Sequence, residues 1–214
     1  MSCEAHCCGL EKLFDEKHAR KQMKRYHRRG TVGATRKLLT LLSEVDITGR
    51  TLLDIGGGVG VIQRELMNAG VASAMDVDSS QGSIRVAQQE AERQNHPTMF
   101  LHGDFTKLAD QIEAADIVTL DKVICCYPNV DDLLTKALDK TKAYVGLVLP
   151  RDSVIARVVL FIGNIAMRLT GNGFRSYMHS PLLVHSMIEN RGFLRIGKDR
   201  TNAWHVWLYG RYDR

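Results

Sequence analysis

Three consecutive glycines, Gly56 to Gly58, and a fourth at Gly60 form the stretch of this sequence best suited to holding a ligand. They follow an apolar run that ends at Ile55 and precede an amphipathic segment, a pattern typical of a buried strand, a tight turn and a helix. Glycine has no Cβ, so the turn can adopt positive φ and a ligand can approach the main chain closely. The start of the helix adds N–H groups without intrahelical partners. The stretch is therefore predicted to bind a ligand through its backbone.

Aspartates follow several apolar runs farther along the chain. In nucleotide-binding folds an acidic residue about twenty positions after the glycines accepts hydrogen bonds from a ribose diol, and both Asp76 and Asp78 stand near that place. Asp104 follows another run within a Gly-Asp-Phe triplet, and Asp121 ends the next one. The glycine spacing differs from G-x-G-x-x-G, because its third glycine comes one residue early. The combined pattern is therefore more informative than the glycines alone.

These residues need elements that bring them together, and the chain supplies alternating strand and helix patterns. Such alternation requires right-handed crossovers and a parallel sheet, with the ligand crevice beyond the carboxyl ends of the strands. Every aspartate named above lies at such an end. The first strand is expected just before the glycines, and the next four near 71–78, 99–105, 115–121 and 142–149.

Capping residues predict where helices begin. Ser79 and Ser80 precede an expected helix at about 81–94, and Asn129 precedes one whose first turn carries two aspartates. Side-chain oxygens and negative charge both suit the N–H groups of a helix start. A Ser-Pro pair begins a further helix, which Gly192 ends, in the order that helix boundaries favour.

The composition is that of an ordinary globular chain. Of its 214 residues, 44% are hydrophobic and 25% charged, which predicts one soluble domain with a substantial core. Residues 1–30 are dense in charge and histidine, unlike a signal peptide, so cytoplasmic localisation is expected. The five cysteines are odd in number and their spacing is unlike a disulfide framework, which predicts reduced thiols.

Taken together, these features resemble the class I S-adenosylmethionine-dependent methyltransferases over residues 51–209. The family pattern of glycine-rich turn, acidic strand end and Gly-Asp pair after the third strand stands here at 53–60, 76–79 and 103–105. Many members that act on small molecules carry a His-His-x-Pro-Asp-like segment after the fourth strand. The corresponding stretch here is Cys-Cys-Tyr-Pro-Asn at 125–129.

A narrower likeness connects the chain with bacterial proteins related to magnesium-protoporphyrin O-methyltransferase. It rests on residues 20–30, on the Cys-Cys-Tyr-Pro segment, on 150–152 and on 174–179. The family resemblance implies an α/β fold with a Rossmann-like seven-stranded sheet, mostly parallel with a final antiparallel strand, and helices on both faces. Two last strands, near 193–197 and 203–209, would form the reversed hairpin.

The resemblance implies S-adenosylmethionine as the cofactor and suggests which residues bind it. Asp54 would bind the methionine amine, directly or through water. Asp78 would accept hydrogen bonds from the ribose hydroxyls, with Asp76 as the alternative. Asp104 would accept one from the adenine amino group, with Phe105 beside the ring.

Four further residues complete the expected cofactor site. Gly56, Gly58 and Gly60 would let the main chain meet the methionine and ribose portions, and Asp121 would lie near the methionine moiety. A surface or turn role is the alternative for each aspartate, above all for Asp121. Because a methyl group on a sulfonium is already activated, the enzyme must chiefly orient the acceptor and exclude water.

The acceptor decides whether the reaction needs a base. A carboxylate acceptor, as in the porphyrin-propionate relatives, needs only positioning, whereas a phenol, amine or thiol gains from general-base catalysis. Tyr127, Tyr177 and His179 are the candidates for that base, although a histidine in a loop is commonly structural. Arg151 and Arg175 are predicted to bind an acidic acceptor in forked geometry, or else to pair with aspartates of the fold.

Tyr26, Cys125 and Cys126 complete the predicted acceptor-binding residues. Tyr26 interrupts the basic segment 17–30 and is expected to close over the ligand or to pack against the sheet. The vicinal cysteines leave an alternative function open, which is methylation of a thiol or metalloid. The chain is divided accordingly into a basic amino-terminal arm or cap at 1–34 and a methyltransferase domain at 35–214.

The amino-terminal cysteines extend that alternative. Cys3, Cys7 and Cys8, together with His6, would complete a metal or metalloid site with the later cysteines if the arm folds over the pocket. The favoured interpretation is a frayed terminus with exposed thiols. No bound metal is therefore expected.

The net charge of +5 and the basic segment also suggest contact with RNA or an acidic membrane surface. A nucleic-acid methyltransferase is not favoured, because residues 126–129 match neither the Asn/Asp-Pro-Pro-Tyr-like loop of base-amino enzymes nor the Pro-Cys of cytosine-carbon enzymes. A binding protein that has kept only the cofactor pocket is a third alternative. A small-molecule acceptor is the expected partner, and the oligomeric state is left open.

A strongly apolar segment lies in the carboxyl-terminal third of the chain. Residues 152–170 are strongly apolar but interrupted by Arg157 and Asn164, and the run is too short to span a bilayer. It is expected to form a helix within a lid insertion at about 151–179. That helix would contact a lipophilic acceptor, a second subunit or the membrane surface, or else pack as a core helix of the lid.

Overall fold

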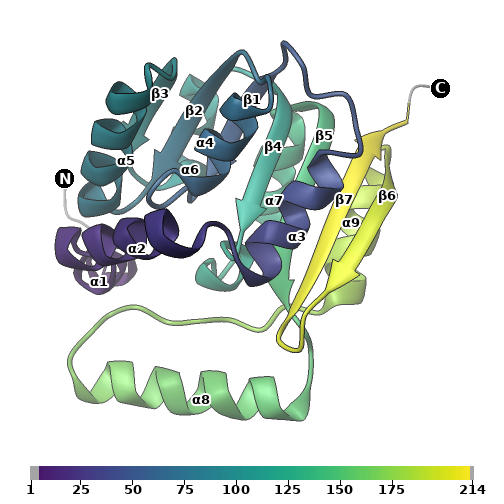
Figure 1. The fold of residues 1–214 in the computed structure, drawn as a ribbon. Coiled ribbons are helices and arrows are strands. Elements are labelled where there is room, and N and C mark those ends of the chain that lie inside the picture. Colours follow the sequence, from purple (N-terminus) through teal and green to yellow (C-terminus); the bar gives the residue numbers. More distant parts are fainter. Residues whose placement is uncertain (1–4, 213–214) are drawn as a thin grey trace.

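The structure is a computed structural model that describes residues 5–212 of the chain, and the side chains of residues 9–212. A seven-stranded sheet in the order β3-β2-β1-β4-β5-β7-β6 forms its centre (Figure 1). The strands are β1 (Thr51–Ile55), β2 (Ser73–Asp78), β3 (Thr98–His102), β4 (Ala115–Asp121), β5 (Thr141–Pro150), β6 (Phe193–Arg200) and β7 (Trp204–Arg211).

Strands β1 to β5 pair parallel, and β7 pairs antiparallel with both β5 and β6. The predicted Rossmann-like sheet with a reversed strand is therefore confirmed. The last hairpin is longer than the sequence predicts, because pairing continues past Gly197 to Arg200 across a register shift. Cross-strand hydrogen bonds override the weak strand propensity of this Gly-Lys-Asp segment, and the connection shortens to residues 201–203.

Helices cover both faces of the sheet, as predicted (Figure 1). Leu52 packs with apolar residues of one helical layer and its neighbour Leu53 with those of the other, because successive strand residues point to opposite faces. The helices of the described residues are α1 (Ala5–Leu13), α2 (Glu16–Arg29), α3 (Gly33–Leu42), α4 (Val61–Asn68), α5 (Gln81–Gln94), α6 (Phe105–Leu108), α7 (Val130–Asp139), α8 (Val154–Leu169) and α9 (Pro181–Asn190), with the short 3-10 turns η1 (Ala109–Gln111) and η2 (Ile124–Cys126).

The two helical layers form separate cores. Helices α3 and α4 pack on the face of Leu52, and α5 lies beside them (Figure 1). Helices α6, α7 and α9 pack on the face of Leu53. The sheet is therefore buried on both sides, as parallel sheets usually are, and its strand ends remain for ligand binding.

Capping side chains fix where several helices begin. Ser80 accepts a hydrogen bond from the Ser83 N–H at 3.0 Å, and Asn129 accepts one from the Asp132 N–H at 3.2 Å, as the sequence predicts. Ser180 precedes α9 without a capping hydrogen bond. The start of α9 is therefore favoured by the proline that follows, whose fixed φ suits a first helical position.

Helix α2 is attached to the domain beside the glycine turn. Met23 packs with Val59 and Val86, and the Tyr26 hydroxyl donates a hydrogen bond to Glu65 Oε1 at 2.6 Å. Most lysine and arginine side chains of α2 point away from this contact and are exposed. One face of the basic segment is therefore apolar and fixed, and the other is solvated.

Helix α8 lies apart from the rest of the domain, at the bottom of Figure 1. None of its residues is buried, although the segment 170–180 runs back between it and the sheet (Figure 1). Within residues 5–212, no helix has both the length and the apolar character needed to cross a bilayer.

Candidate active site

A cavity of about 650 Å³ opens beyond the carboxyl ends of β1, β2 and β4. The β1–α4 turn, the first residues after β2 and β4, helix α2, the start of α3 and the β6–β7 turn all contribute to its wall. The topology explains the place, because the strand order reverses between β1 and β4 and leaves a crevice there. The predicted ligand site therefore lies where a parallel sheet puts one.

The glycines of the β1–α4 turn serve different purposes. Gly56, Gly58 and Gly60 have φ values of 67°, 60° and 77°, in the left-handed region that favours glycine. A Cβ at Gly58 would meet no atom within 4 Å, so the turn leaves free space on the cavity side. Gly60 instead faces α5, where a Cβ would lie 3.3 Å from Ala87 Cβ. Gly56 and Gly58 line the cavity, and Gly60 allows close helix packing.

Gly57 is required for a different reason. A Cβ there would lie 2.3 Å from Gln63 Nε2, 2.6 Å from Asp76 Oδ1 and 2.8 Å from Asp54 Oδ2. These polar side chains are almost fully buried, so they have little room to move. The sequence pattern had marked the other glycines, but the packing beneath the turn depends on this one.

Asp78 ends β2 at the cavity wall, where its carboxylate supports the glycine turn. Its Oδ2 accepts a hydrogen bond from the Gly58 N–H at 2.9 Å, and its Oδ1 accepts one from the Ser80 N–H at 2.7 Å. Burial raises the pKa of Asp78, while these two N–H groups oppose the shift. The carboxylate is thus positioned with remaining acceptor capacity toward the cavity, as a ribose diol requires.

Asp76 does not reach the cavity. It is fully buried, and neither carboxylate oxygen has a hydrogen-bond partner. Burial, followed by the nearby charges of Asp78 and Asp54, raises the pKa of Asp76 well above its ordinary value. The side chain lies beneath the glycine turn, where burial favours its protonated form, and Asp78 rather than Asp76 lines the wall.

Asp54 lies at the end of β1 and lines the inner wall of the cavity. Its carboxylate accepts hydrogen bonds from Thr119 Oγ1 at 2.7 Å and Gln63 Nε2 at 3.2 Å. Burial raises the pKa of Asp54 to about 7, and the two hydrogen bonds limit that shift.

This raised pKa predicts a pH effect on the cofactor-free protein. Because the folded-state pKa exceeds the ordinary value of 3.8, native Asp54 keeps its proton where the unfolded residue loses it. The contribution of Asp54 to the free energy of unfolding should therefore fall as pH rises from about 4 to 7, by up to ~1.4 kcal/mol per pH unit. Asp54→Asn should flatten this slope in chemical denaturation measured across the range. An unchanged slope in the variant would assign the effect to another group.

Asp121 and Lys122 form a polar corner at the end of β4. Asp121 Oδ2 accepts a hydrogen bond from Thr35 Oγ1 at 2.5 Å, and Lys122 Nζ lies 3.0 Å from Asp121 Oδ1. Lys122 adopts φ of 66°, a conformation that non-glycine residues seldom hold outside special sites. All three residues line the cavity. The turn after β4 therefore places an ammonium group at the wall.

Asp104 and Phe105 are used differently from the prediction for the adenine ring. The Asp104 carboxylate caps α6 by accepting hydrogen bonds from Thr106 N–H at 3.0 Å and Thr106 Oγ1 at 2.9 Å. Phe105 is buried in the core, with 1% of its surface exposed. Gly103 lines the cavity, whereas neither of these residues does. A local cap competes for the carboxylate, which the sequence pattern alone does not reveal.

Tyr26, Cys126 and Tyr127 lie at the cavity wall as predicted, while Cys125 is buried behind them. Burial, with the nearby charge of Asp104, raises the pKa of Tyr127 well above its ordinary value. Burial likewise raises the pKa of Tyr26. Both phenols therefore keep their protons at neutral pH and act as hydrogen-bond donors rather than as bases.

Tyr177 and His179 buttress the wall without reaching the cavity. The Tyr177 N–H donates to the Cys125 carbonyl at 2.8 Å, and His179 Nε2 lies 2.8 Å from the Tyr127 carbonyl oxygen. The two rings stack with centroids 6.2 Å apart. Their predicted role as bases therefore lacks a contact with the cavity, and both hold the η2 segment in place instead.

The two arginines predicted to bind an acidic acceptor are also engaged elsewhere. Arg151 Nη1 lies 3.4 Å from the carbonyl oxygens of Thr201 and Asn202. Arg175 Nη1 donates to the carbonyls of Asn172 and Phe174 at 2.9 and 2.7 Å. Neither arginine lines the cavity, because Arg151 contacts the β6–β7 turn and Arg175 stabilises its own loop.

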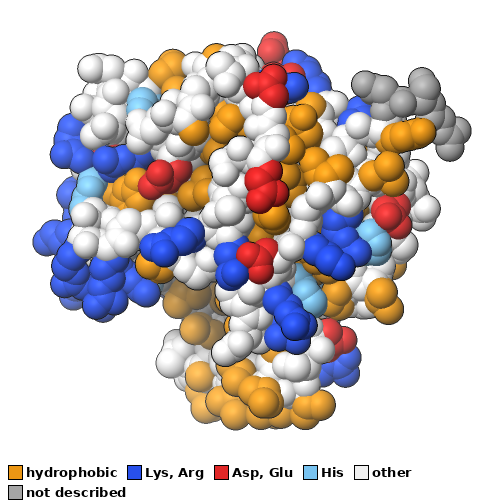
Figure 2. All heavy atoms as spheres, turned by 45° about the vertical axis from the view of Figure 1, so that its right-hand side comes forward, with side chains coloured by type: hydrophobic (Ala, Val, Ile, Leu, Met, Phe, Trp, Pro, Cys, Tyr) orange, Lys and Arg blue, Asp and Glu red, His pale blue; other side chains and the backbone are white. Residues whose placement is uncertain are grey.

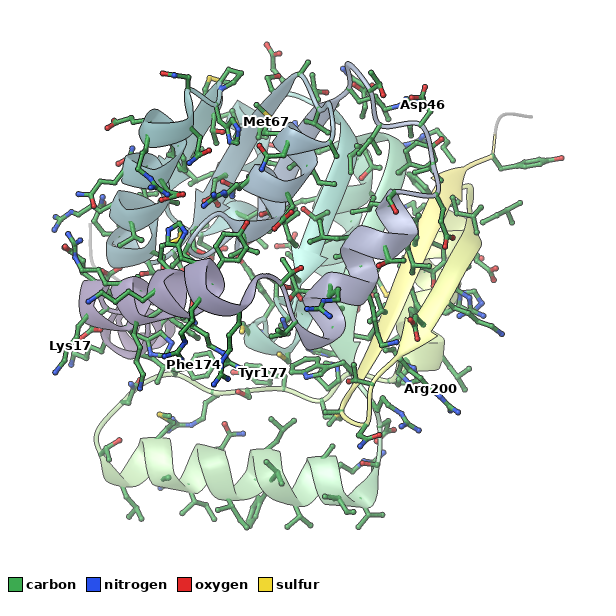
Figure 3. All side chains as sticks on the ribbon, in the orientation of Figure 1. Lys17, Asp46, Met67, Phe174, Tyr177 and Arg200 are labelled. Carbon is green, nitrogen blue, oxygen red and sulfur yellow. The ribbon has the colours of Figure 1, made fainter. Side chains whose placement is uncertain are left out.

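Other residues supply the outer wall and were not predicted. They come from helix α2, the start of α3 and the β6–β7 turn, segments without a chemical motif. Figure 3 shows that side chains from these segments point into the space between α2, α3 and the ends of the strands. The most prominent are Gln22, Arg25, Thr35 and Trp204, which begins β7; Lys122, after β4, was likewise not predicted.

The predicted metal or metalloid constellation lies partly outside the described residues. Cys3 precedes them, and the side chains of His6, Cys7 and Cys8 are likewise not described. Among the residues that the structure describes, no group of three or more histidine, cysteine or acidic side chains is arranged to hold a metal ion.

Comparison with known sequences finds a methyltransferase domain. Residues 53–143 match the family described as "Methyltransferase domain". The chain is also 33% identical over 64 residues to the ribosomal protein L11 methyltransferases of Erwinia tasmaniensis and Escherichia coli. That alignment covers 30% of this chain and spans 22% of the length of those curated relatives.

Solved structures share the fold along most of the chain. The magnesium protoporphyrin IX methyltransferase of Synechocystis PCC 6803 with bound S-adenosylhomocysteine has a TM-score of 0.69 at 18% identity, covering 94% of this chain and 98% of that one. An O-methyltransferase family 2 protein of Planctomyces limnophilus, in complex with apigenin, has a TM-score of 0.66 at 18% identity. There the match covers 92% of this chain and 61% of the other.

The sheet, the glycine turn and the wall of carboxylates define a Rossmann-like nucleotide-binding fold of the methyltransferase type. The chain contains a methyltransferase domain at residues 53–143, and it shares the fold of solved methyltransferases that hold S-adenosylmethionine or S-adenosylhomocysteine.

Proposed function

We propose that this chain transfers a methyl group from S-adenosylmethionine to an oxygen atom of a small acceptor that is lipophilic, acidic or both. One observation carries the proposal. A single continuous cavity joins the glycine turn and Asp78 to an outer half with aromatic and cationic side chains, Tyr127, Trp204 and Lys122. The first half suits an adenosyl sulfonium, and the second suits a flat anion.

The cofactor half fits its ligand on structural grounds. Free space at Gly58 accommodates a ribose near the main chain, and the Asp78 carboxylate faces the same space. Asp54 would bind the methionine amine, with Asp121 nearby. We assign the adenine to the region of Gly103, where Asp104 would have to exchange its cap for a contact with the ring. The bound cofactor supplies a methyl group activated by the sulfonium charge.

The acceptor half favours positioning over acid–base catalysis. Lys122 and Arg25 would attract a carboxylate, and the aromatic walls would bury a planar body. Tyr127 keeps its proton, so it would donate a hydrogen bond to the acceptor. A carboxylate already carries the negative charge needed for attack, so this wall suffices without a base. One solved structure of this fold is named for magnesium protoporphyrin IX, and another was crystallised with apigenin. Both compounds are planar and largely apolar, which supports an acceptor of this kind.

Residues 1–34 and about 151–179 would control access to this cavity. Helix α2 already contributes Gln22, Arg25 and Tyr26 to the wall, so the arm would act as a cap. The segment after α8 borders the same wall through the Tyr177 and His179 contacts described above. We therefore assign the arm and the lid insertion to water exclusion around the methyl transfer.

Turnover assays test the proposed function. The purified chain is expected to bind S-adenosylmethionine but not NADH in isothermal titration, and to release S-adenosylhomocysteine with protoporphyrin or apigenin as acceptor. Cofactor binding with turnover only on thiols or arsenite would overturn the oxygen acceptor. Preference for NADH over S-adenosylmethionine would overturn the assignment of the cavity itself.

Lys122→Met should separate the two halves of the site. Loss of the ammonium should raise KM for an acidic acceptor about tenfold, the effect expected for one charged hydrogen bond, and leave S-adenosylmethionine affinity within about twofold. Steady-state kinetics with the acid and its methyl ester measure this, because the ester lacks the charge. Lys142→Met, on an exposed lysine of β5, is the matched control. Equal loss with acid and ester would contradict a charge-specific role.

The vicinal cysteines provide the test of the alternative function. Cys126 lines the cavity, and both sulfur atoms approach the Lys122 carbonyl, at 3.4 and 3.7 Å. If the oxygen acceptor is correct, a Cys125→Ser, Cys126→Ser double variant should keep most of its turnover in the S-adenosylhomocysteine assay. Complete loss of turnover with intact cofactor binding would favour methylation of a thiol or metalloid.

A further inference from the structure

Helix α8 exposes an unusually apolar surface. Phe161 is 66% exposed and Leu169 is 82% exposed, in a helix without a single buried residue. A large continuous patch of exposed apolar side chains usually marks a surface that binds another molecule or a membrane. The exposed apolar residues of α8 are Val154, Ile155, Val158, Val159, Phe161, Ile162, Ile165 and Leu169.

The opposite face of α8 fixes how the helix is presented. Asn164 is partly covered, and its side-chain amide donates to the Ser176 carbonyl at 2.9 Å while its carbonyl accepts from the Ser176 N–H at 2.8 Å. These two hydrogen bonds attach the middle of α8 to the returning segment and orient the helix. The apolar side is therefore directed away from the domain, as the orange surface at the bottom of Figure 2 shows.

The net charge on and around α8 is positive. The helix has no acidic residue; of its two arginines, Arg157 pairs with Asp152 just before the helix at 2.7 Å, and Arg168 has no acidic partner among the described residues. Figure 2 shows a gathering of lysine and arginine side chains on the left side of the molecule, above the apolar surface of α8, where α2 lies. Exposed cations of α2 that have no acidic partner in the described structure are Lys17, Lys21, Lys24, Arg25, Arg28 and Arg29.

We propose that α8 docks on an anionic membrane surface, with its apolar side among the lipid chains near the headgroups and the α2 cations beside acidic headgroups. An apolar face combined with nearby basic residues is the composition of interfacial helices. A second copy fits less well, because α8 has no acidic residue that could pair with Arg168 or with the α2 cations of the other copy. The proposal concerns the surface of the chain and does not depend on the identity of the acceptor.

Docking would place the cavity close to the lipid. The segment that follows α8 donates a hydrogen bond from Tyr177 N–H to the Cys125 carbonyl, and His179 lies against the Tyr127 carbonyl. Both carbonyls belong to residues of η2 or directly after it, next to the acceptor half of the cavity. The segment that follows α8 therefore connects this helix with the acceptor half. A lipophilic acceptor dissolved in the bilayer would then reach the cavity without crossing bulk water.

Vesicle flotation with the full-length purified chain tests the proposal. The probes are vesicles of phosphatidylcholine alone and of phosphatidylcholine mixed with phosphatidylglycerol, without any acceptor. We expect the chain to float with the anionic vesicles and to lose this binding at high salt. Phe161→Glu should lower the bound fraction about tenfold or more, because it removes a large apolar side chain from the lipid-facing side and puts a negative charge there.

Two further variants make the result specific. Lys21→Glu with Lys24→Glu should weaken binding to anionic vesicles about tenfold or more and have little effect on phosphatidylcholine vesicles. Met99→Glu is the matched control, because Met99 is 64% exposed on edge strand β3, away from α8. This substitution should leave flotation unchanged. Titration with S-adenosylmethionine verifies that each variant is folded, since none of these positions lines the cavity.

Three results would overturn the proposal. Equal flotation of the natural chain and Phe161→Glu would remove α8 as the docking element. An absence of flotation, with a dimer in sedimentation that Phe161→Glu dissociates, would assign the apolar face to a second copy. An absence of flotation from a chain that stays monomeric would mean that no membrane or self-association role exists for this face.

Discussion

Asp78→Ala is expected to weaken S-adenosylmethionine binding by about 10- to 100-fold. The carboxylate supports the glycine turn through the Gly58 N–H and faces the space assigned to the ribose. Its removal therefore takes away charged hydrogen bonds to the ligand and loosens the turn, and each such bond is worth about 1.5–3 kcal/mol. Isothermal titration calorimetry measures the change directly.

Two variants show whether this effect is specific. Asp46→Ala removes an exposed carboxylate from the far end of the domain (Figure 3) and should leave the affinity unchanged. Asp76→Asn keeps the shape of a buried side chain whose protonated form is favoured and which does not line the cavity, so it should alter cofactor affinity by less than about threefold. Unchanged binding by Asp78→Ala, with a large loss for Asp76→Asn, would mean that the ribose ligand is misassigned.

Gly57→Ala should be the most damaging single-methyl substitution in the glycine turn. The added Cβ would approach Gln63 Nε2 to 2.3 Å and two buried aspartates to less than 3 Å. Because these groups are buried and hydrogen bonded or tightly packed, the turn must shift, at a cost of about 1–3 kcal/mol of folding free energy. The shift would also displace Gly58, so cofactor affinity should fall about tenfold or more. Urea denaturation and titration calorimetry on the same samples measure both effects.

Gly163→Ala is the matched control for this substitution. Gly163 lies in exposed helix α8, and a Cβ there would meet no atom within 4 Å. Helix propensity alone should make this change neutral to stabilising, by up to about 1 kcal/mol. If Gly57→Ala were equally neutral, the close packing beneath the turn would not matter for stability or binding.

Local signals in the sequence predicted the elements that surround the cavity. The strand, the glycine turn and the caps at Ser80 and Asn129 depend on neighbours within a few positions, so the sequence pattern contains their cause. The alternation of strands and helices similarly determines a parallel sheet and its ligand crevice. Asp78 lines that crevice because it is the last residue of β2.

The sequence pattern does not reveal how deeply a side chain is buried or which other groups compete for its hydrogen bonds. Asp76 and Asp78 share one face of β2, but Asp76 lies two residues farther inside the sheet, about 6–7 Å from the strand end, and is buried there. Asp104 shows competition, because the start of α6 takes up its carboxylate. Arg151 contacts carbonyls of the β6–β7 turn, and Arg175 donates to carbonyls of its own loop. None of these outcomes depends on sequence spacing alone.

By itself, the amino-acid sequence determined the local features of the fold. These are the apolar runs that become buried strands, the places where the chain turns, and the carboxylates that follow a strand. Those features depend on side-chain chemistry and backbone freedom over a few residues. Only the tertiary structure decided the acceptor half, where Thr35, Lys122 and Trp204 meet although about 170 positions separate the first from the last. It also decided that α8 presents its apolar side outward, because no other surface of the described domain covers it.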